Sequence, residues 1–196
     1  MAQTDTFATF LIIGPTCFFL GILFASFPYD YNVLWTTPAD KEAYFKILED
    51  HIKFLYASPP LISRILHIVI GTGLVGFLMK LYRATEANYL FDGASLVLYF
   101  AGVLVYLTNI VKGFRVVTVG IYGADHDLPE GAADDYISRE DTLRVFAASN
   151  TILALVLVGV LVLQAGQWYA LRKEEAEIAA MDQAAEEKKK AGKKKQ

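Results

Sequence analysis

The chain has 196 residues, of which 55% are hydrophobic and 20% are charged. Soluble domains carry about 25% charged residues, and the apolar residues here gather in long blocks, which excludes an ordinary soluble globule and wholesale disorder alike. The formal net charge is -3, and no broad basic face of the kind that binds nucleic acid is present. The single cysteine, Cys17, excludes an intramolecular disulfide.

Four blocks are apolar enough to cross a bilayer, which takes roughly 20 residues per helix. We expect an all-α membrane protein, a four-transmembrane-helix bundle with spans at about 7–27, 61–81, 91–111 and 145–169. The first block lacks the basic start and the cleavage site of a signal peptide, so we expect a true span. The second block is long enough only if Arg64 and Lys80 extend toward opposite headgroup regions. Pro59 and Pro60 precede it, where a helix start tolerates proline.

The first long loop, at about 28–63, contains the pattern of a further helix. Thr37 can cap that helix, Pro38 suits its first position, and Asp40 favours its first turn. Apolar residues then recur near helical spacing at Tyr44, Leu48, Ile52, Leu55 and Tyr56. We expect this helix to lie on the membrane surface or on the other long loop, with a partner-binding face as the alternative.

The second long loop, at about 112–144, is acidic and rich in turn residues. Its cluster Asp125-His126-Asp127 resembles a metal site only superficially, because calcium loops need more oxygen ligands at fixed spacing. We therefore expect a solvated turn and no metal or other cofactor. Between the second and third spans, the loop at about 80–92 is short.

The composition changes at Arg172, which divides a membrane domain, 1–171, from a charged tail, 172–196. The tail begins as a charged helix and ends in lysine runs, which are often only solvated. Lys193 and Lys194 nevertheless fit the C-terminal dilysine pattern by which coat proteins recognise cargo for retrieval to the endoplasmic reticulum.

The use of that signal would require a cytosolic C-terminus, and four spans then make the N-terminus cytosolic and both long loops lumenal. The Lys and Arg residues of the tail agree with this orientation. Four basic residues instead lie on the side that it makes lumenal: Lys112, Arg115, Arg139 and Arg144.

Small and polar residues within the spans indicate helix packing. Gly71-x-Gly73-x-x-Gly76 matches a dinucleotide fingerprint in form, but that motif needs a strand and a soluble unit, so we expect close helix packing. Gly21 and Ala25, four residues apart, should allow the same close packing in the first span. The amides and hydroxyls of the spans should bond across helices, with contact to another protein's helix as the alternative: Asn109, Ser149, Asn150 and Gln164. His67 should be packed or hydrogen-bonded rather than a proton relay, and the spans otherwise hold almost no titratable group.

No nucleophile–base pair, two-histidine metal spacing or carboxylate pair occurs within the expected spans. We therefore expect a protein that is not an enzyme. Three segments do resemble a known family: 18–24 running into Pro28-Tyr29-Asp30-Tyr31; Tyr-Leu-Thr-Asn at 106–109; and Ala-Ser-Asn at 148–150 leading to 163–169. With four spans and a Lys/Glu tail, the chain resembles the fungal packaging chaperones of the endoplasmic reticulum, the Shr family.

The resemblance implies a multi-pass endoplasmic-reticulum membrane chaperone that assists the folding of amino-acid permeases, prevents their aggregation and supports their packaging into COPII vesicles. The tail would contact COPII coat components transiently, and the dilysine end would contact the COPI coat. Candidate client contacts are Gly21, Asn109, Ser149 and Asn150, and the candidate lumenal-edge motif is Pro28, Tyr29, Asp30 and Tyr31.

Two other functions stay open from the sequence. An accessory subunit of a transporter or channel would use the same helix packing, but would reach the cell surface with its partner. A small intramembrane enzyme would need a catalytic group, and the loss of an activity on a single polar substitution such as Asn109→Ala would reveal one.

Overall fold

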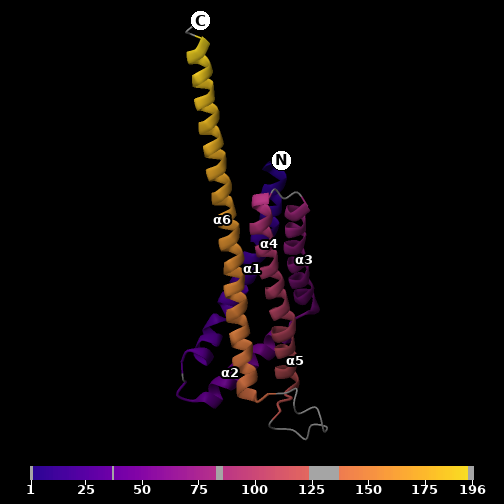
Figure 1. The fold of residues 1–196 in the computed structure, drawn as a ribbon. Helices are drawn as coiled ribbons and strands as arrows, with labels where there is room; N and C mark the ends of the chain where they lie inside the picture. Colours follow the sequence, from indigo (N-terminus) through magenta and orange to yellow (C-terminus); the bar gives the residue numbers. More distant parts are fainter. Residues whose placement is uncertain (1, 37, 83–85, 124–136, 194–196) are drawn as a thin grey trace.

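The computed structural model describes residues 2–36, 38–82, 86–123 and 137–193, and these form helices and no strand. The helices, in chain order, are α1 (Ala2–Leu34), α2 (Lys41–Tyr56), α3 (Pro60–Tyr82), α4 (Glu86–Val105), the π-helix η1 (Tyr106–Ile110), α5 (Val111–Val119) and α6 (Arg139–Lys193) (Figure 1). Four segments of the described chain are long and apolar enough to cross a membrane: Thr6–Leu34, Pro60–Tyr82, Tyr89–Val119 and Arg139–Glu187. The predicted fold class is therefore confirmed.

Two of the helices extend well beyond the spans expected from the positions of charged residues. α1 continues through Asp30 to Leu34, and the third apolar helix continues through η1 and α5 to Val119. Gly120 then ends α5 in a left-handed conformation, with φ of 75°, the usual helix-terminating role of glycine. Charged side chains are therefore poor predictors of where these helices end, because a paired or half-buried charge does not stop a helix.

The four long helices form a ring in the order α1, α3, α4 and α6. α1 packs on α3 and α6, while α4 packs on α3 and α6. Glycine permits the closest approaches: a Cβ atom at Gly76 would lie 2.9 Å from the Leu11 side chain on α1, and one at Gly73 would collide with the Tyr99 hydroxyl on α4. The predicted packing role is thus confirmed for these two glycines, whereas Gly71 has no neighbouring atom within 4 Å.

α2 crosses one end of this ring, packed on α5 and on the start of α6. Its N-cap is Asp40, whose carboxylate accepts a hydrogen bond from the Ala43 N–H at 3.0 Å. The prediction of Asp40 within the first turn was wrong, because its side chain completes the cap; the predicted cap, Thr37, lies outside the described residues. The buried face comprises Phe45, Leu48 and Ile52. Since α5 and the start of α6 belong to the second long loop expected at about 112–144, the expected contact of this helix with the other long loop is observed in its described residues.

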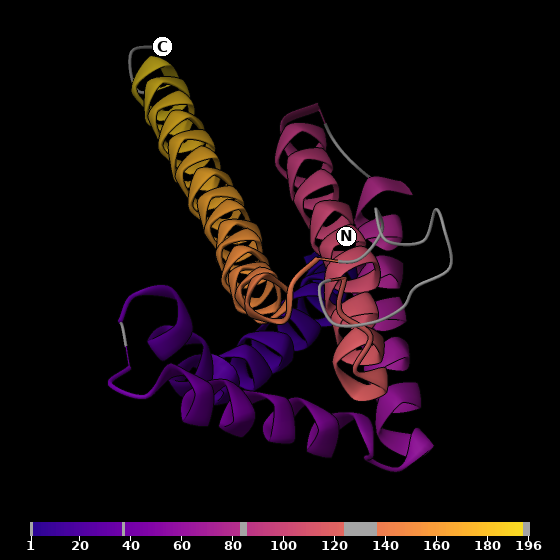
Figure 2. The same ribbon diagram turned by 90° about the horizontal axis from the view of Figure 1, so that it is seen from below.

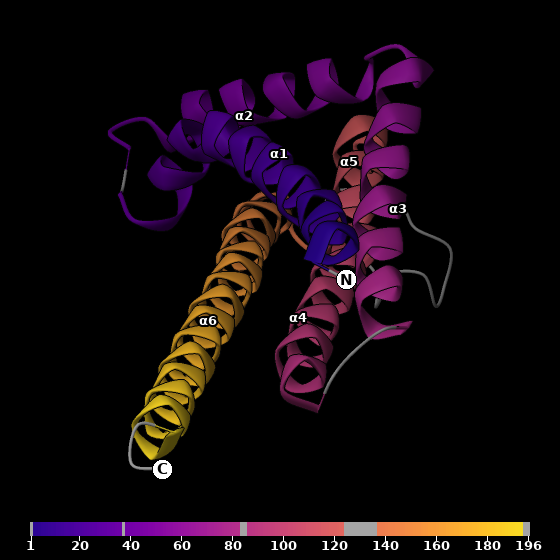
Figure 3. The ribbon, with the colours of Figure 1, turned by 90° about the horizontal axis from the view of Figure 1, so that it is seen from above.

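The ring is not equally tight along its length. α1 and α3 meet where Ala8, Leu11 and Ile12 lie against Gly76, and they diverge toward the opposite end, where α2 bridges the gap between them (Figures 2 and 3). At the other end α6 extends far beyond the bundle (Figure 1), and its described side chains from Trp168 to Glu187 are exposed. The acidic cluster Asp125-His126-Asp127 lies outside the described residues.

Candidate functional site

The gap between the diverging helices is a cavity of about 730 Å³. α1, α2, α3, η1, α5 and α6 all contribute to its walls, and most of the lining side chains are apolar. Several of these apolar residues are also exposed on the outer surface of the chain, among them Ile22, Tyr56, Ile62 and Leu107. The cavity therefore lies within the membrane domain with an apolar rim.

The polar part of this cavity is built around Asp30 on α1. Asp30 is only 2% exposed, and its Oδ2 atom accepts a hydrogen bond of 3.0 Å from the Asn150 amide on α6. His51 on α2 stacks on the Tyr29 ring, with ring centroids 3.9 Å apart and planes 8° apart. Among the described residues, His51 Nε2 is the buried side-chain polar atom that has no hydrogen-bond partner.

The Pro28-Tyr29-Asp30-Tyr31 motif lies inside α1 rather than after it, and its residues have different roles. The Tyr44 hydroxyl on α2 donates to the Tyr29 carbonyl at 2.7 Å and approaches the Pro28 carbonyl at 3.4 Å. Asp30 faces α6, as described, and Tyr31 is 45% exposed beside Trp35. The motif thus joins α1 to both α2 and α6 at the cavity.

A polar cluster at the start of α6 fixes α2 in place. Arg139 donates to Glu42 and Glu49 at 2.7 Å each, and the Tyr122 hydroxyl also donates to Glu49 at 2.7 Å. Burial alone would raise the pKa of Glu49, but the hydrogen bonds from Arg139 and Tyr122 outweigh it and the pKa is lowered. Burial lowers the pKa of His51, which favours the neutral imidazole. α2 is therefore a fixed wall of the cavity.

The π-helix η1 forms another wall, where Tyr106, Leu107 and Ile110 line the cavity. Single turns of π-helix are rare and often occur at functional sites. Asn109, in the same turn, donates to the Ser149 hydroxyl on α6 at 3.1 Å. The His67 ring packs edge-on against Tyr106, with centroids 6.2 Å apart.

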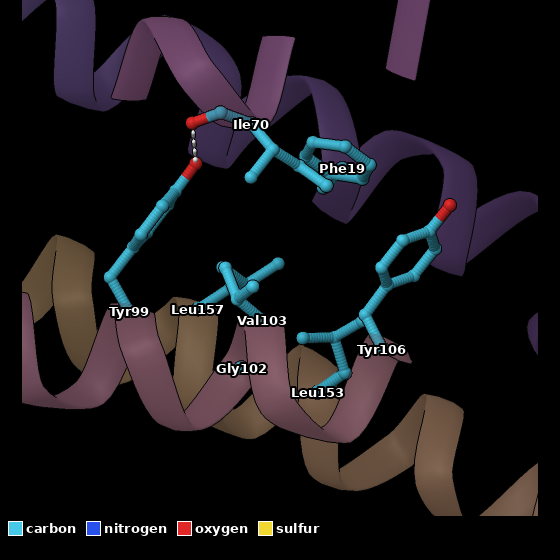
Figure 4. Close-up of a pocket in the computed structure, with 8 residues that line it drawn as sticks. All are labelled: Phe19, Ile70, Tyr99, Gly102, Val103, Tyr106, Leu153 and Leu157. Carbon is cyan, nitrogen blue, oxygen red and sulfur yellow. Dashed lines mark hydrogen bonds between the residues drawn. The ribbon is translucent and has the colours of Figure 1, made fainter. Parts of the chain in front are cut away.

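A smaller apolar void of about 20 Å³ is lined by side chains of α1, α3, α4, η1 and α6 (Figure 4). Phe19, Tyr106 and Leu153 also line the larger cavity. Figure 4 shows the Tyr99 hydroxyl directed at the Ile70 carbonyl, to which it donates at 3.1 Å. A hydrogen bond between α4 and α3 thus forms part of the wall of this void.

The predicted cross-helix hydrogen bonds are confirmed for Asn109, Ser149, Asn150 and Gln164. Ser149 and Asn150 are buried by the chain itself, whereas Asn109 remains exposed. Gly21 is exposed on α1, and no atom of the chain lies within 4 Å of a Cβ built there. Of the dilysine pair, Lys193 is the last residue of α6, and Lys194 lies outside the described residues.

The expectations that Lys80 extends toward the headgroups and that the spans hold almost no titratable group were wrong. Lys80 on α3 is 9% exposed, and its Nζ lies 3.0 Å from Asp92 on α4, which is 1% exposed. Lys80 also donates to Gln164 and Gln167 at 2.8 and 2.6 Å. These two amides donate in turn to Asp92 at 3.2 and 2.8 Å, which completes a buried polar cluster.

Two sequence signals could have revealed this cluster. Lys80 and Asp92 carry opposite charges at facing ends of consecutive antiparallel spans, joined by a short loop. Gln164 and Gln167 are three apart and so share a helix face. The cluster satisfies its own donors and acceptors and joins α3, α4 and α6, so it stabilises the ring rather than forming a binding site.

Residues 3–196 match the model of the SHR3 chaperone family, described as ER membrane protein SH3. The secretory component protein psh3 of Schizosaccharomyces pombe is 24% identical over 159 residues, which are 81% of this chain and 67% of that protein. No solved structure matches the chain. Because the family match covers nearly the whole chain, including every element around the cavity, the protein belongs to the SHR3 family of endoplasmic-reticulum membrane chaperones.

Proposed function

We propose that the protein assists the folding of amino-acid permeases in the endoplasmic-reticulum membrane, prevents their aggregation and supports their packaging into COPII vesicles. Its membership of a family of membrane chaperones supports this function. The observation that carries the proposal is the cavity of about 730 Å³ between diverging helices, whose apolar rim is accessible within the membrane domain. Such a space suits the helices of an incompletely packed membrane protein.

The size of the cavity favours transient contact with one face of a client helix. A helix about 10 Å across rises 1.5 Å per residue, so about 730 Å³ equals only some six residues of its length. Lipid supplies little hydrophobic drive between helices, and association depends on close packing and interhelical hydrogen bonds. Shallow insertion of side chains therefore provides weak contacts that a client replaces when its own helices pack.

The candidate site residues divide into two groups in this proposal. Gly21 and Asn109 are exposed and would contact the client directly. Ser149 and Asn150 are buried and would act by holding η1 and α1 against α6. The lumenal-edge motif, Pro28 to Tyr31, would anchor α2 across the lumenal end of the cavity.

The proposed orientation has both termini in the cytosol and α2 on the lumenal side. The tail, 172–196, then carries its charged residues into the cytosol, where COPII coat components would contact it during vesicle formation. Lys193 and Lys194 would return escaped protein through the COPI coat. A separate role for the tail in contacting coat proteins is supported by the exposure of the described α6 side chains beyond Leu171.

The test is deletion of the protein from its host, followed by separate tracking of amino-acid permeases and of soluble secreted proteins. We expect the permeases to aggregate and accumulate in the endoplasmic reticulum while general secretion continues. A protein that resides with a permease at the plasma membrane would instead be an accessory subunit, and this observation would refute the chaperone function.

A further inference from the structure

The carboxyl group of Asp30 is unusual for a membrane helix because most of its hydrogen-bonding capacity is unused. One oxygen accepts the Asn150 amide, and Asp30 is 2% exposed. A carboxylate has about four acceptor positions, and ionisable residues inside membrane proteins are costly and usually have a partner. The neighbouring wall adds His51, whose buried Nε2 has no partner among the described residues. Both residues line the same cavity.

The rest of the cavity lining offers these groups no cation. Its lining residues include no Lys or Arg in the described part of the chain. Arg139 on α6, which contacts α2, is already bound by Glu42 and Glu49. Ser26 and Ser63 add hydroxyl groups to the lining. The lining therefore contains no cationic partner for the carboxyl group of Asp30, and the hydrogen bond that this group accepts among the described residues comes from the Asn150 amide.

We propose that this cavity selects client transmembrane helices by a hydrogen-bond donor, an arginine, lysine, asparagine or glutamine side chain, which inserts beside Asp30 and His51. The inference rests on the proposed chaperone function and gives it a chemical specificity. Membrane transporters need polar side chains within their spans, and before the bundle packs those side chains face lipid at a high free-energy cost. An acceptor in an apolar cavity shields such a donor until a partner within the client replaces it.

The charge of the site favours a protein client over a phospholipid. Lipid phosphates are recognised by clusters of Lys and Arg, and the cavity lining has neither, with a carboxyl group at its polar end. The volume also fits a few side chains from one helix face. The depth is specific: Asp30 lies four residues before the end of α1, or about 6 Å along the helix. A client donor should therefore lie about one turn from the lumenal end of its span.

Binding of synthetic helices to the full-length protein tests this selection. The protein is reconstituted into phosphatidylcholine vesicles with Leu/Ala peptides that carry Arg, Gln, Leu or Glu one turn from one end, and energy transfer reports binding. We expect the Arg and Gln peptides to bind roughly three- to thirtyfold more tightly than the Leu peptide, the range of a single interhelical hydrogen bond. The Glu peptide should bind most weakly, since two carboxyl groups would face each other.

Two variants alter these polar groups with little change of shape. Asp30→Asn keeps an oxygen for the Asn150 amide and replaces the carboxyl group by an amide, while His51→Phe keeps a ring stacked on Tyr29 and removes the ring nitrogens. We expect Asp30→Asn to abolish the preference for Arg over Leu and His51→Phe to reduce it. Equal binding of the four peptides to the unaltered protein, or an unchanged preference in both variants, would overturn the inference.

A second pair of variants tests the cavity without altering the acceptors. Ser63→Trp introduces bulk at the α3 wall, whereas Val75→Trp is a matched control on an exposed position of α3 outside the cavity lining. Of these two variants, we expect only Ser63→Trp to weaken the binding of all four peptides. Phospholipid that copurifies in the cavity and that no peptide displaces would refute a client site.

The preference for helices that carry a donor and the proposed chaperone function can be refuted by different results. Suppression of permease aggregation without donor preference would overturn this inference and leave the proposed function standing. Absence of any suppression of permease aggregation would overturn the proposed function itself.

Discussion

The buried cluster of Lys80, Asp92, Gln164 and Gln167 allows a quantitative test of how the four-helix ring is held together. Asp92→Ala removes the acceptor of three contacts, which have lengths of 3.0, 3.2 and 2.8 Å. Each interhelical bond contributes about 0.6–2 kcal/mol in a membrane, and breaking one side of a buried ion pair costs about 3–5 kcal/mol. Three such bonds together contribute about 2–6 kcal/mol, a range that contains the cost of breaking the ion pair, so we expect Asp92→Ala to lower the free energy of unfolding by about 3–5 kcal/mol.

The double variant Lys80→Met with Asp92→Leu separates the ion pair from simple packing. Replacing a buried pair by apolar residues of similar volume is often neutral or stabilising, so we expect the double variant to be far less destabilised than the sum of its two single variants. Unfolding in mixed detergent micelles, followed by loss of helicity, measures all three proteins. Additive single effects, or a cost below 1 kcal/mol for Asp92→Ala, would refute the reasoning. Glu140→Gln, at the exposed pair with Arg144, is the control and should change stability by less than about 0.5 kcal/mol.

Three further predictions concern the packing, the fixed position of α2 and the tail. Gly76→Ala should cost about 1–3 kcal/mol in the same unfolding assay because its Cβ would meet α1, whereas Gly21→Ala has open space and should be neutral or slightly stabilising. The lowered pKa of Glu49 means that its contribution to stability is present above the ordinary glutamate range and is lost as pH falls through the folded-state value. Hydrogen exchange in α2, corrected for intrinsic rates, should therefore accelerate below about pH 4.5, and an equal acceleration in Glu49→Gln would contradict this assignment. Removal of residues 172–196 should leave permeases soluble in mild detergent yet alter their export or the retrieval of the chaperone. A loss of permease folding equal to that caused by deleting the whole protein would show that the roles of residues 1–171 and 172–196 are not separable.

Hydrophobic blocks predicted the number and approximate positions of the membrane helices because burial in lipid requires long apolar runs. The same blocks predict helix ends less well, because a helix can continue past the charged residue that ends an apolar run. Asp92 lies inside a helix because Lys80 and two glutamines satisfy its carboxylate, and Asp30 lies inside α1 with Asn150 as the partner of one of its oxygens. Such partners lie 12 to 120 positions apart in the chain, and pairing at that separation depends on the order of helices in the ring.

The candidate site was predictable only in part for a similar reason. The Pro28–Tyr31 motif and the amides Asn109 and Asn150 were identified from the sequence, and the structure brings them to one end of the bundle. The cavity itself arises from the divergence of α1 and α3, which close packing at Gly76 sets from the other end. His51 was not singled out, because a histidine on an amphipathic helix gives no sign of a buried atom without a partner.

The continuous course of α6 has a mechanical consequence. An unpacked helix is marginal in water because its first turn is costly to form, but the membrane-embedded part of α6 supplies that first turn, and the exposed part only propagates it. The pairs Lys173–Glu177 and Glu186–Lys190 add small stabilising contacts along it. From Arg172 to Lys193 the helix rises about 30 Å. The end of α6 at Lys193 is therefore held at a set distance and a set rotational angle from the bundle, and inserting one residue after Leu171 would turn that end by about 100° without breaking any contact in the membrane.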